Sequence, residues 1–311
     1  MKNNPRSIHL AGDFFMAETK TPQVSNLASE LQRANRTLIE SLDHGLSSGT
    51  QLHAALHHHF SAGGGRVRMA LALDSGRRLG LSEKNRLRLA LATELIHNAS
   101  LIHDDLQDQD PTRRGKPAVW VTYGTDVAIL AGDYLLASAF GQLGHCTQEV
   151  PALIQHFQKR TSDLIFGQAL DLASGDAKES FSLQRYRQIV SAKSGALLSM
   201  PLELTLLASG QDMYLPAAQN AGEAFAVAYQ ISDDLTDIQA DARHDCLNVV
   251  HALLQLGQET ALHVAITEGQ VQCQQAIDLA DTLPNGCAKL MAEKAKQLLM
   301  HFNQLEETHT P

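Results

Sequence analysis

The sequence is short of cysteine, of glycine and proline, and of long apolar runs, and each shortage excludes a class of protein. Its four cysteines lie far apart without a Cys-x-x-Cys pair, which is typical of reduced structural thiols in a cytosolic protein. Glycine and proline number 21 and 9 among 311 residues, fewer than a turn-rich β-sandwich usually needs. No apolar run approaches the roughly 18 residues of a transmembrane helix, and the charged first twenty residues do not resemble a secretory signal.

The chain also lacks an excess of positive charge. Its formal net charge is −9 and it has no long block of lysine or arginine, which disfavours nucleic acid or an anionic membrane as a partner. With 44% hydrophobic and 19% charged residues, it is neither a disordered tail nor a coiled coil. We therefore expect a folded cytoplasmic protein without a transmembrane segment.

Helical periodicity is what the sequence has in quantity. Leu27, Leu31, Leu38 and Leu42 recur at spacings of four and seven with polar residues between them. A further helix is predicted to start after Ser82, a candidate N-cap, and to run to about residue 108, before the proline-containing break at residues 110–117. Similar patterns predict helices over about 63–79, 125–144, 150–173, 183–208, 215–241, 246–256, 259–283 and 286–305. No strand pattern survives, so we predict one all-α domain over residues 25–311 after a poorly ordered segment at 1–24.

Two copies of the motif Asp-Asp-Leu-x-Asp lie late in two of these predicted helices. Their acidic residues are Asp104, Asp105 and Asp108, and Asp233, Asp234 and Asp237. Helical positions i, i+1 and i+4 are expected to bring three carboxylates onto one side of each helix, where their repulsion favours a bound cation. Oxygen ligands with room for water and phosphate suit Mg²⁺. A solvated acidic face is the simpler alternative, but the apolar residues before each motif favour two walls of one cavity.

Basic residues lie where they could hold a diphosphate beside these clusters. The candidates are Arg66, Arg68, His97, Arg113, Arg114 and Lys193. Arg113 and Arg114 follow the first motif in a loop bent by a proline, where they could bind two phosphate groups. Arg66 and Arg68 follow three consecutive glycines, whose N–H groups favour anions. For Arg113 and Arg114, the alternative interpretation is ordinary surface charge. The histidine lies two turns before Asp104, and the lysine lies inside an apolar helix, where it needs an anionic ligand or a buried carboxylate.

With these motifs in order along the chain, the sequence resembles the trans-isoprenyl diphosphate synthases, the polyprenyl synthetase family, of the geranylgeranyl or farnesyl diphosphate synthase kind. The resemblance covers roughly residues 27–305. It rests on five motifs, at residues 94–108, 113–117, 167–172 (Gly-Gln-Ala-Leu-Asp-Leu), 193–196 (Lys-Ser-Gly-Ala) and 229–237. Five motifs in the family's order make the match specific.

The resemblance implies a helical bundle around a deep central cavity, of the isoprenoid synthase type and usually a homodimer. It implies that both aspartate motifs hold Mg²⁺, usually three ions, on the diphosphate of an allylic substrate. As pyrophosphate leaves, isopentenyl diphosphate would attack the allylic cation, which gives a longer trans-polyprenyl diphosphate.

The resemblance also assigns roles to individual residues. The metal ligands or their close supports would be Asp104, Asp105, Asp108, Asp233, Asp234 and Asp237. The allylic diphosphate would be held by Arg113 and Lys193 with Gln230 nearby, and isopentenyl diphosphate by Arg68, His97 and Arg114. Ala99 and Ser100, one turn before the first motif, are small where the family uses aromatic residues to stop the product at about fifteen carbons, so we expect a product of C20 or longer.

The sequence departs from the family pattern in two places. Where the family has the lysine of Gly-Gly-Lys-x-x-Arg, this chain has Gly65, and Arg66 is a candidate replacement. After Asp237 the usual glycine- and lysine-rich segment is missing, which leaves Arg243 as its candidate substitute. These departures keep two alternatives open: a terpene cyclase or diphosphatase of the same fold, and a non-catalytic subunit that modulates a true synthase.

Three consecutive histidines at residues 57–59 could bind a metal. Adjacent residues on a helix do not share a face, so we interpret them instead as a surface cluster.

Overall fold

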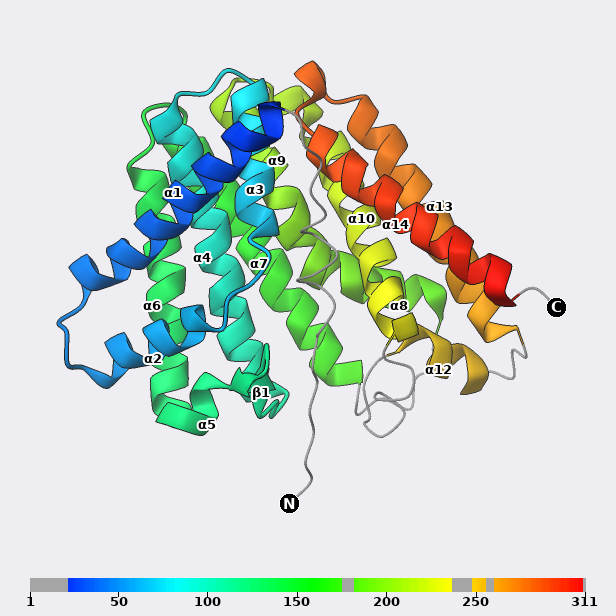
Figure 1. The fold of residues 1–311 in the computed structure, drawn as a ribbon, viewed down its shortest axis with the longest axis horizontal. Coiled ribbons are helices and arrows are strands. Elements are labelled where there is room, and N and C mark those ends of the chain that lie inside the picture. The colour runs from blue at the N-terminus through cyan, green and yellow to red at the C-terminus, as the bar shows by residue number, and fades with distance from the viewer. Residues whose placement is uncertain (1–21, 175–181, 237–247, 256–259, 310–311) are drawn as a thin grey trace. The chain divides into compact units, whose positions relative to one another are not determined.

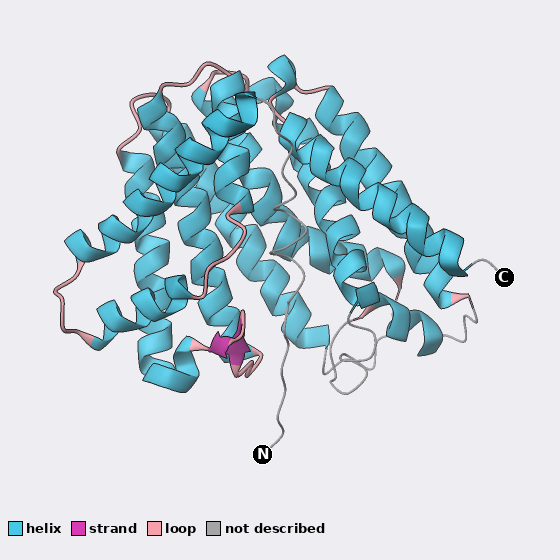
Figure 2. Cartoon of the chain, viewed as in Figure 1, coloured by secondary structure: helices cyan, strands magenta, loops and turns pink. Residues whose placement is uncertain are grey.

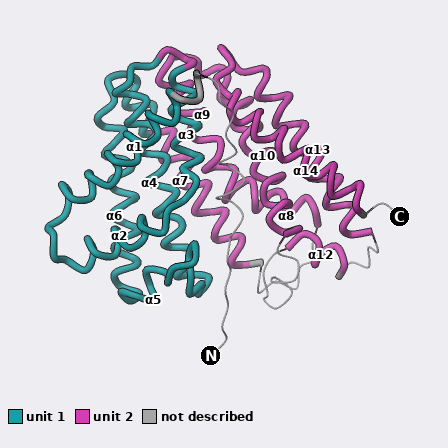
Figure 3. The backbone as a smooth tube through the Cα atoms, in the orientation of Figure 1, with its two compact units in different colours: residues 1–77, 81–154 teal, residues 78–80, 155–311 magenta. Residues whose placement is uncertain are grey.

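The chain is almost entirely helical in the computed structural model, which describes residues 22–174, 182–236, 248–255 and 260–309 (Figures 1 and 2). The predicted all-α class is therefore confirmed. The backbone groups into two compact units, residues 1–77 with 81–154 (unit 1) and residues 78–80 with 155–311 (unit 2), shown in Figure 3. The single domain and its central cavity stay predictions, and residues 1–21 lie outside the described residues.

Unit 1 is built on two long helices that pack along each other, α4 (Glu83–Gln107) and α6 (Thr125–Gly144). Around them lie α1 (Pro22–Gly45), α2 (Gln51–Ser61), α3 (Val67–Arg78) and α5 (Val119–Tyr123). Ser82 caps α4 as predicted, because its hydroxyl accepts the Asn85 N–H at 3.2 Å. Gly132 allows α6 to approach α4, since a Cβ there would lie 2.1 Å from Nε2 of His103.

Unit 2 is centred on α10 (Leu215–Thr236), which packs against α9 (Ala196–Ala208) and α13 (Ala261–Asp281). Its other elements are most of α7 (Val150–Ser174), α8 (Leu183–Val190), η2 (Ser191–Gly195), η3 (Asp212–Tyr214), α12 (Val249–Gln255), η4 (Pro284–Gly286) and α14 (Lys289–His309). The helix predicted over residues 183–208 is interrupted by η2, a turn of π-helix that carries Lys193. Such turns are rare and often lie at functional sites.

One small hairpin was not predicted. Thr112–Arg113 (β1) pairs antiparallel with Lys116–Pro117 (β2). The two residues between them, Arg114 and Gly115, have φ of 52° and 74°, and positive φ at both central residues is the signature of a type I′ turn. Strands of two residues are too short for side-chain alternation to appear in a sequence, which explains the difference.

Among the described residues, α6 alone is long and apolar enough to cross a membrane, and 33% of its most apolar window is buried. Core and interface helices pass the same test, so length and composition do not place α6 in a membrane. Ile129 and Leu130 are 44% and 55% exposed, so α6 presents apolar surface that unit 1 itself does not cover.

Candidate active site

The first aspartate cluster lies where α4 ends in unit 1. The Asp110 N–H donates to the Asp105 carbonyl at 2.8 Å and the Gln109 N–H to the Leu106 carbonyl at 3.3 Å, while Gln109 has φ 56°. This is a Schellman motif, which stops the helix directly after the cluster. Asp104 and Asp108 are both half-buried and lie one turn apart, so their carboxylates share one side of the helix end.

Asp105, the middle residue of this cluster, is directed into the protein instead. It is 1% exposed, and its Oδ1 accepts hydrogen bonds from Nε of Arg113 at 2.8 Å and from Nη2 of the same guanidinium. Burial raises the pKa of the Asp105 carboxyl, while the Arg113 charge acts in the opposite direction. The expectation of three carboxylates on one side is therefore wrong here. Residue i+1 lies about 100° around the helix from residue i.

The second cluster, at the end of α10 in unit 2, repeats this arrangement. Asp233 is half-buried and Asp234 is only 3% exposed. Oδ2 of Asp234 accepts the Tyr186 hydroxyl at 2.9 Å and the Val249 N–H at 2.8 Å, and its Oδ1 accepts Nε2 of Gln230 at 2.9 Å. The middle aspartate is thus bound by the protein in both motifs. Asp237 and Arg243 lie outside the described residues.

Two supports of Asp234 were missed by the sequence analysis. Tyr186 is buried on α8, and burial followed by the Asp234 charge holds the pKa of its phenol well above the usual value, so it remains a hydrogen-bond donor. Asn248 donates from Nδ2 to the Asp234 main-chain carbonyl at 2.8 Å. No sequence signal identifies either residue, because Tyr186 lies 48 residues before Asp234 and Asn248 lies 14 residues after it, and both are outside the five motifs.

A group of cations surrounds His97 in unit 1. Nη1 of Arg68 lies 3.2 Å from Nε2 of His97, which is 9% exposed. Burial, followed by the charges of Arg68, Arg114 and Arg66, holds the pKa of His97 well below its usual value, so the ring is neutral at pH 7. Because Glu94 neutralises Arg66, the net positive charge beside the neutral imidazole comes from Arg68 and Arg114, and it suits an anion.

The glycine-rich loop places one of these cations. The Arg114 guanidinium donates to the main-chain carbonyl of Gly63. Gly64 has φ 134°, and a Cβ there would lie 2.5 Å from Nη1 of Arg114. Glycine is therefore required at this position for two reasons: the backbone conformation and the close approach of the arginine.

Arg66 is not available to replace the lysine that the family has at the position of Gly65. Its Nη1 forms an ion pair with Oε1 of Glu94 at 3.0 Å, and its Nε donates to Oδ1 of Asn35 at 2.8 Å. The side chains of Arg66 and Glu94 are only 9% and 2% exposed. The interpretation of Arg66 as a substitute is therefore wrong, since its charge is neutralised inside unit 1.

Lys193 lies beside the motif at residues 167–172 within unit 2. Its Nζ forms an ion pair with Oδ2 of Asp171 at 2.9 Å, so a carboxylate is its partner here. Gly167 makes this possible, because a Cβ there would lie 2.5 Å from the backbone nitrogen of Lys193. Gln168 is 8% exposed, and neither polar atom of its amide has a hydrogen-bond partner within the described residues.

The residues expected to control product length lie on α4. Ala99 is 2% exposed, whereas Ser100 is half-buried and donates its hydroxyl to the His97 carbonyl at 2.9 Å. Both side chains are small, as the expectation of a longer product requires.

The three consecutive histidines point in different directions, as expected for adjacent helical residues. His58 bonds through Nε2 to the Pro117 carbonyl at 2.7 Å, whereas His59 is 4% exposed and bonds to Oδ1 of Asn98 at 2.9 Å. The surface-cluster interpretation is therefore wrong for His59. Burial lowers the pKa of His59 to about 3.

Residues 50–277 match the sequence model of the family described as Polyprenyl synthetase. The chain belongs to the polyprenyl synthetase family. A geranylgeranyl diphosphate synthase of Cyanophora paradoxa is 38% identical over 230 residues, which are 68% of this chain and 75% of that protein. Membership of this family makes the chain a transferase.

Solved structures share the fold. A geranylgeranyl pyrophosphate synthetase of the archaeon Geoglobus acetivorans superposes with a TM-score of 0.80 at 24% identity, covering 88% of this chain and 99% of that one. A polyprenyl synthase of Caulobacter crescentus, complexed with calcium and isoprenyl diphosphate, superposes with a TM-score of 0.76 at 21% identity, covering 91% and 99%. The isoprenoid synthase fold is therefore confirmed for this polyprenyl synthetase.

Proposed function

We propose that this polyprenyl synthetase condenses an allylic diphosphate with isopentenyl diphosphate and releases a trans-polyprenyl diphosphate of C20 or longer. The observation that carries the proposal is the repeated design of the aspartate motifs. In each, the middle carboxylate is bound inside the protein and an outer carboxylate lies half-buried at the end of a long helix. An acidic helix face that is only solvated does not require a buried and hydrogen-bonded middle aspartate, yet both copies have one.

The outer carboxylates suit a hard divalent cation. Asp104 and Asp108 offer oxygen ligands one turn apart, and Asp233 offers them in unit 2. Bound Mg²⁺ would neutralise charge on the departing pyrophosphate, and three ions are the number that the family resemblance implies. Asp105 and Asp234 would then position the helix ends rather than bind metal through both oxygens.

The basic residues divide between the two substrates. Arg68, His97 and Arg114 would bind the diphosphate of isopentenyl diphosphate, because they form the positive site beside the glycine loop. Lys193 would contact the allylic diphosphate by exchanging its Asp171 partner for phosphate, with Gln230 nearby. Arg113 would act through Asp105, since its guanidinium is buried on that carboxylate. No nucleophilic serine or cysteine is needed, because the double bond of isopentenyl diphosphate attacks the allylic cation. The departed pyrophosphate can then take up the proton that the condensed cation loses.

The apolar face of α6 supports a homodimer. Ile129 and Leu130 together with Val121 of α5 are between 44% and 55% exposed. A second copy of this chain would cover them and remove apolar surface from water. Static light scattering after size exclusion would give twice the chain mass of 33.8 kDa, and Leu130→Glu would return the mass to that of one chain.

The deciding assay combines the purified protein, Mg²⁺, isopentenyl diphosphate and an allylic primer, with products identified by mass. Elongation to C20 or longer supports the proposal, and Asp104→Asn and Asp233→Asn should each abolish it. Release of pyrophosphate without elongation would instead indicate a cyclase or diphosphatase. Absence of any reaction without an added synthase would indicate a modulating subunit.

A further inference from the structure

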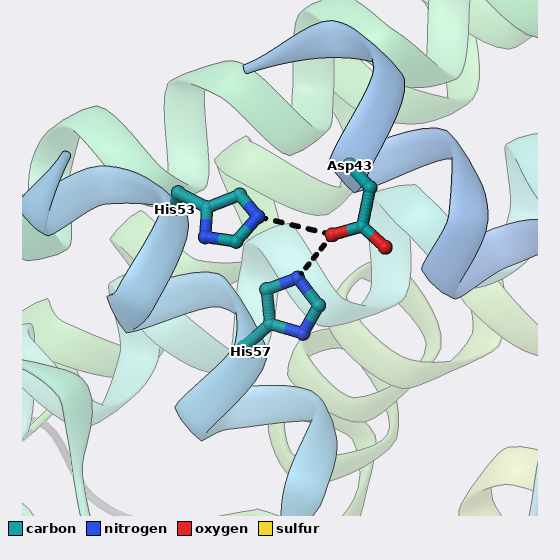
Figure 4. A group of neighbouring side chains, drawn as sticks. All are labelled: Asp43, His53 and His57. Atoms are coloured by element: carbon teal, nitrogen blue, oxygen red, sulfur yellow. Dashed lines mark hydrogen bonds and ion pairs between the residues drawn. The ribbon is translucent and has the colours of Figure 1, made fainter. Parts of the chain in front are cut away.

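A group of two histidines and one aspartate lies where α1 meets α2, apart from the aspartate motifs and the cations assigned to the substrates. Nε2 of His53 lies 3.0 Å and Nε2 of His57 lies 2.7 Å from the same atom, Oδ1 of Asp43 (Figure 4). The ligand atoms of all three residues lie within 4.8 Å of one another. All three belong to unit 1, so their arrangement comes from within one compact body.

Local structure brings the two imidazoles together. His53 and His57 occupy positions i and i+4 of α2, so their rings lie on one side of the helix, with centroids 4.4 Å apart. The start of α2 is held by Thr50, whose hydroxyl accepts the His53 N–H at 3.2 Å. Asp43 comes from the last turn of α1, on the other side of the short connection at residues 46–50. The three side chains therefore join two helices across their loop.

The donor atoms are those of a transition-metal site rather than of a magnesium site. Two imidazole nitrogens and one carboxylate oxygen suit Zn²⁺, whereas Mg²⁺ prefers oxygen ligands alone. A tetrahedral ion with bonds of about 2.0 Å places neighbouring ligand atoms roughly 3.3 Å apart. The observed 3.0 and 2.7 Å would have to open by roughly 0.3 and 0.6 Å. The two imidazole nitrogens, which lie within 4.8 Å of each other, would have to reach the same spacing, and side-chain rotations provide such changes.

We propose that Asp43, His53 and His57 bind one zinc ion, with water as the fourth ligand, and that the ion clamps α1 to α2. The side chains of Asp43 and His57 are 50% and 35% exposed, which leaves room for the water and a path of entry. Hydrogen bonds from both imidazoles lower the pKa of Asp43, so the carboxylate is ionised, as a ligand must be. Without the ion the same three groups form two ordinary hydrogen bonds, which is the arrangement seen here.

Zinc binding to the full-length protein, stripped with chelator and saturated with Mg²⁺, tests this proposal. The excess Mg²⁺ is added to fill the metal site proposed at the aspartate motifs, and a chromophoric chelator then competes with the protein for added Zn²⁺. We expect one equivalent of Zn²⁺ to be retained and to raise the melting temperature. His53→Gln and His57→Gln should each weaken binding at least about tenfold, since even the loss of an outer-shell partner costs that much. Asp43→Asn keeps an oxygen acceptor for both histidines but is a poorer ligand, so it should weaken binding without unfolding the protein.

The matched control is His58→Gln, one residue along the same helix, whose Nε2 bonds to Pro117 and not to the cluster. This control matters because the chain has 15 histidines, any of which could bind zinc weakly. His58→Gln should retain the zinc affinity and the thermal shift of the wild type. Equal zinc binding by the wild type and by the His53→Gln/His57→Gln double variant would overturn the proposal, as would binding lost equally with His58→Gln.

Discussion

Gly64→Ala tests whether the glycine loop places Arg114 for the isopentenyl diphosphate site. A Cβ at this position would lie 2.5, 2.6 and 2.8 Å from Nη1, Cζ and Nη2 of Arg114, all closer than real Cβ contacts. The far end of a flexible side chain yields more readily than backbone. The variant should therefore displace the guanidinium from the Gly63 carbonyl and leave the rest of the loop in place.

The size of the effect follows from the contact that is lost. A charge-assisted hydrogen bond contributes about 1.5–3 kcal/mol, so loss of the Arg114–phosphate contact should raise KM for isopentenyl diphosphate roughly ten- to a hundredfold. KM for the allylic primer should change little, since its proposed contacts lie elsewhere. The φ of 134° adds a separate loss of stability, about 1–3 kcal/mol for a strained non-glycine residue.

Gly49→Ala is the control that separates the effect of backbone strain from the effect of the lost Arg114 contact. Gly49 has φ 102°, and a Cβ there would meet no atom within 4 Å, so alanine introduces strain without displacing a cation. Steady-state kinetics with each substrate varied in turn, together with urea unfolding, should show a stability loss in both variants and a raised KM only in Gly64→Ala. Equal KM values in the two variants, or a KM raised for both substrates alike, would refute the reasoning.

Three further predictions concern product length, metal affinity and acid stability. Ala99→Tyr and Ser100→Phe should shorten the product seen by mass spectrometry, and an unchanged length would remove these residues from the cavity wall. Tyr186→Phe deletes a hydrogen bond to the buried Asp234 carboxylate, so it should cost about 1–3 kcal/mol in urea unfolding and raise the Mg²⁺ concentration needed for half activity. If only stability falls, the tyrosine is merely structural. Because the folded pKa of His59 is about 3, the unfolded chain binds this proton first as the pH falls below 6.5. Unfolding free energy should therefore drop by about 1.4 kcal/mol per pH unit between pH 6 and 4 from this group, and His59→Gln should show a shallower decline.

Periodicity predicted the helices because it reports the buried face of each element directly. The predicted end of α4 near residue 108 was confirmed, and Ser82 was confirmed as its cap. What periodicity does not report is a contact between segments. The turn η2, which interrupts one predicted helix, lies where Gly167 closely approaches Lys193, and no local sequence pattern contains that distance.

The sequence could name candidate residues for the site but not the partners that those residues have in the structure. Arg66 and Lys193 were both expected to be candidates for binding a diphosphate. Only the structure shows that one is neutralised by buried Glu94 and the other paired with half-exposed Asp171. The i, i+4 spacing of His53 and His57 is visible in the sequence, but their contact with Asp43 joins two helices and leaves no local pattern.

In both aspartate motifs, the outer and middle aspartates have different roles although they are the same residue type. On a helix, residues i and i+4 lie about 40° apart in projection, whereas residue i+1 is turned about 100° away. A motif that places its outer aspartates toward a ligand must therefore turn the middle one toward a neighbouring element. In this chain, Asp105 meets Arg113 and Asp234 meets Tyr186. The middle aspartate thus holds the end of each helix against a neighbouring element. The turn of about 100° that directs it away from the outer aspartates also directs it toward that neighbour.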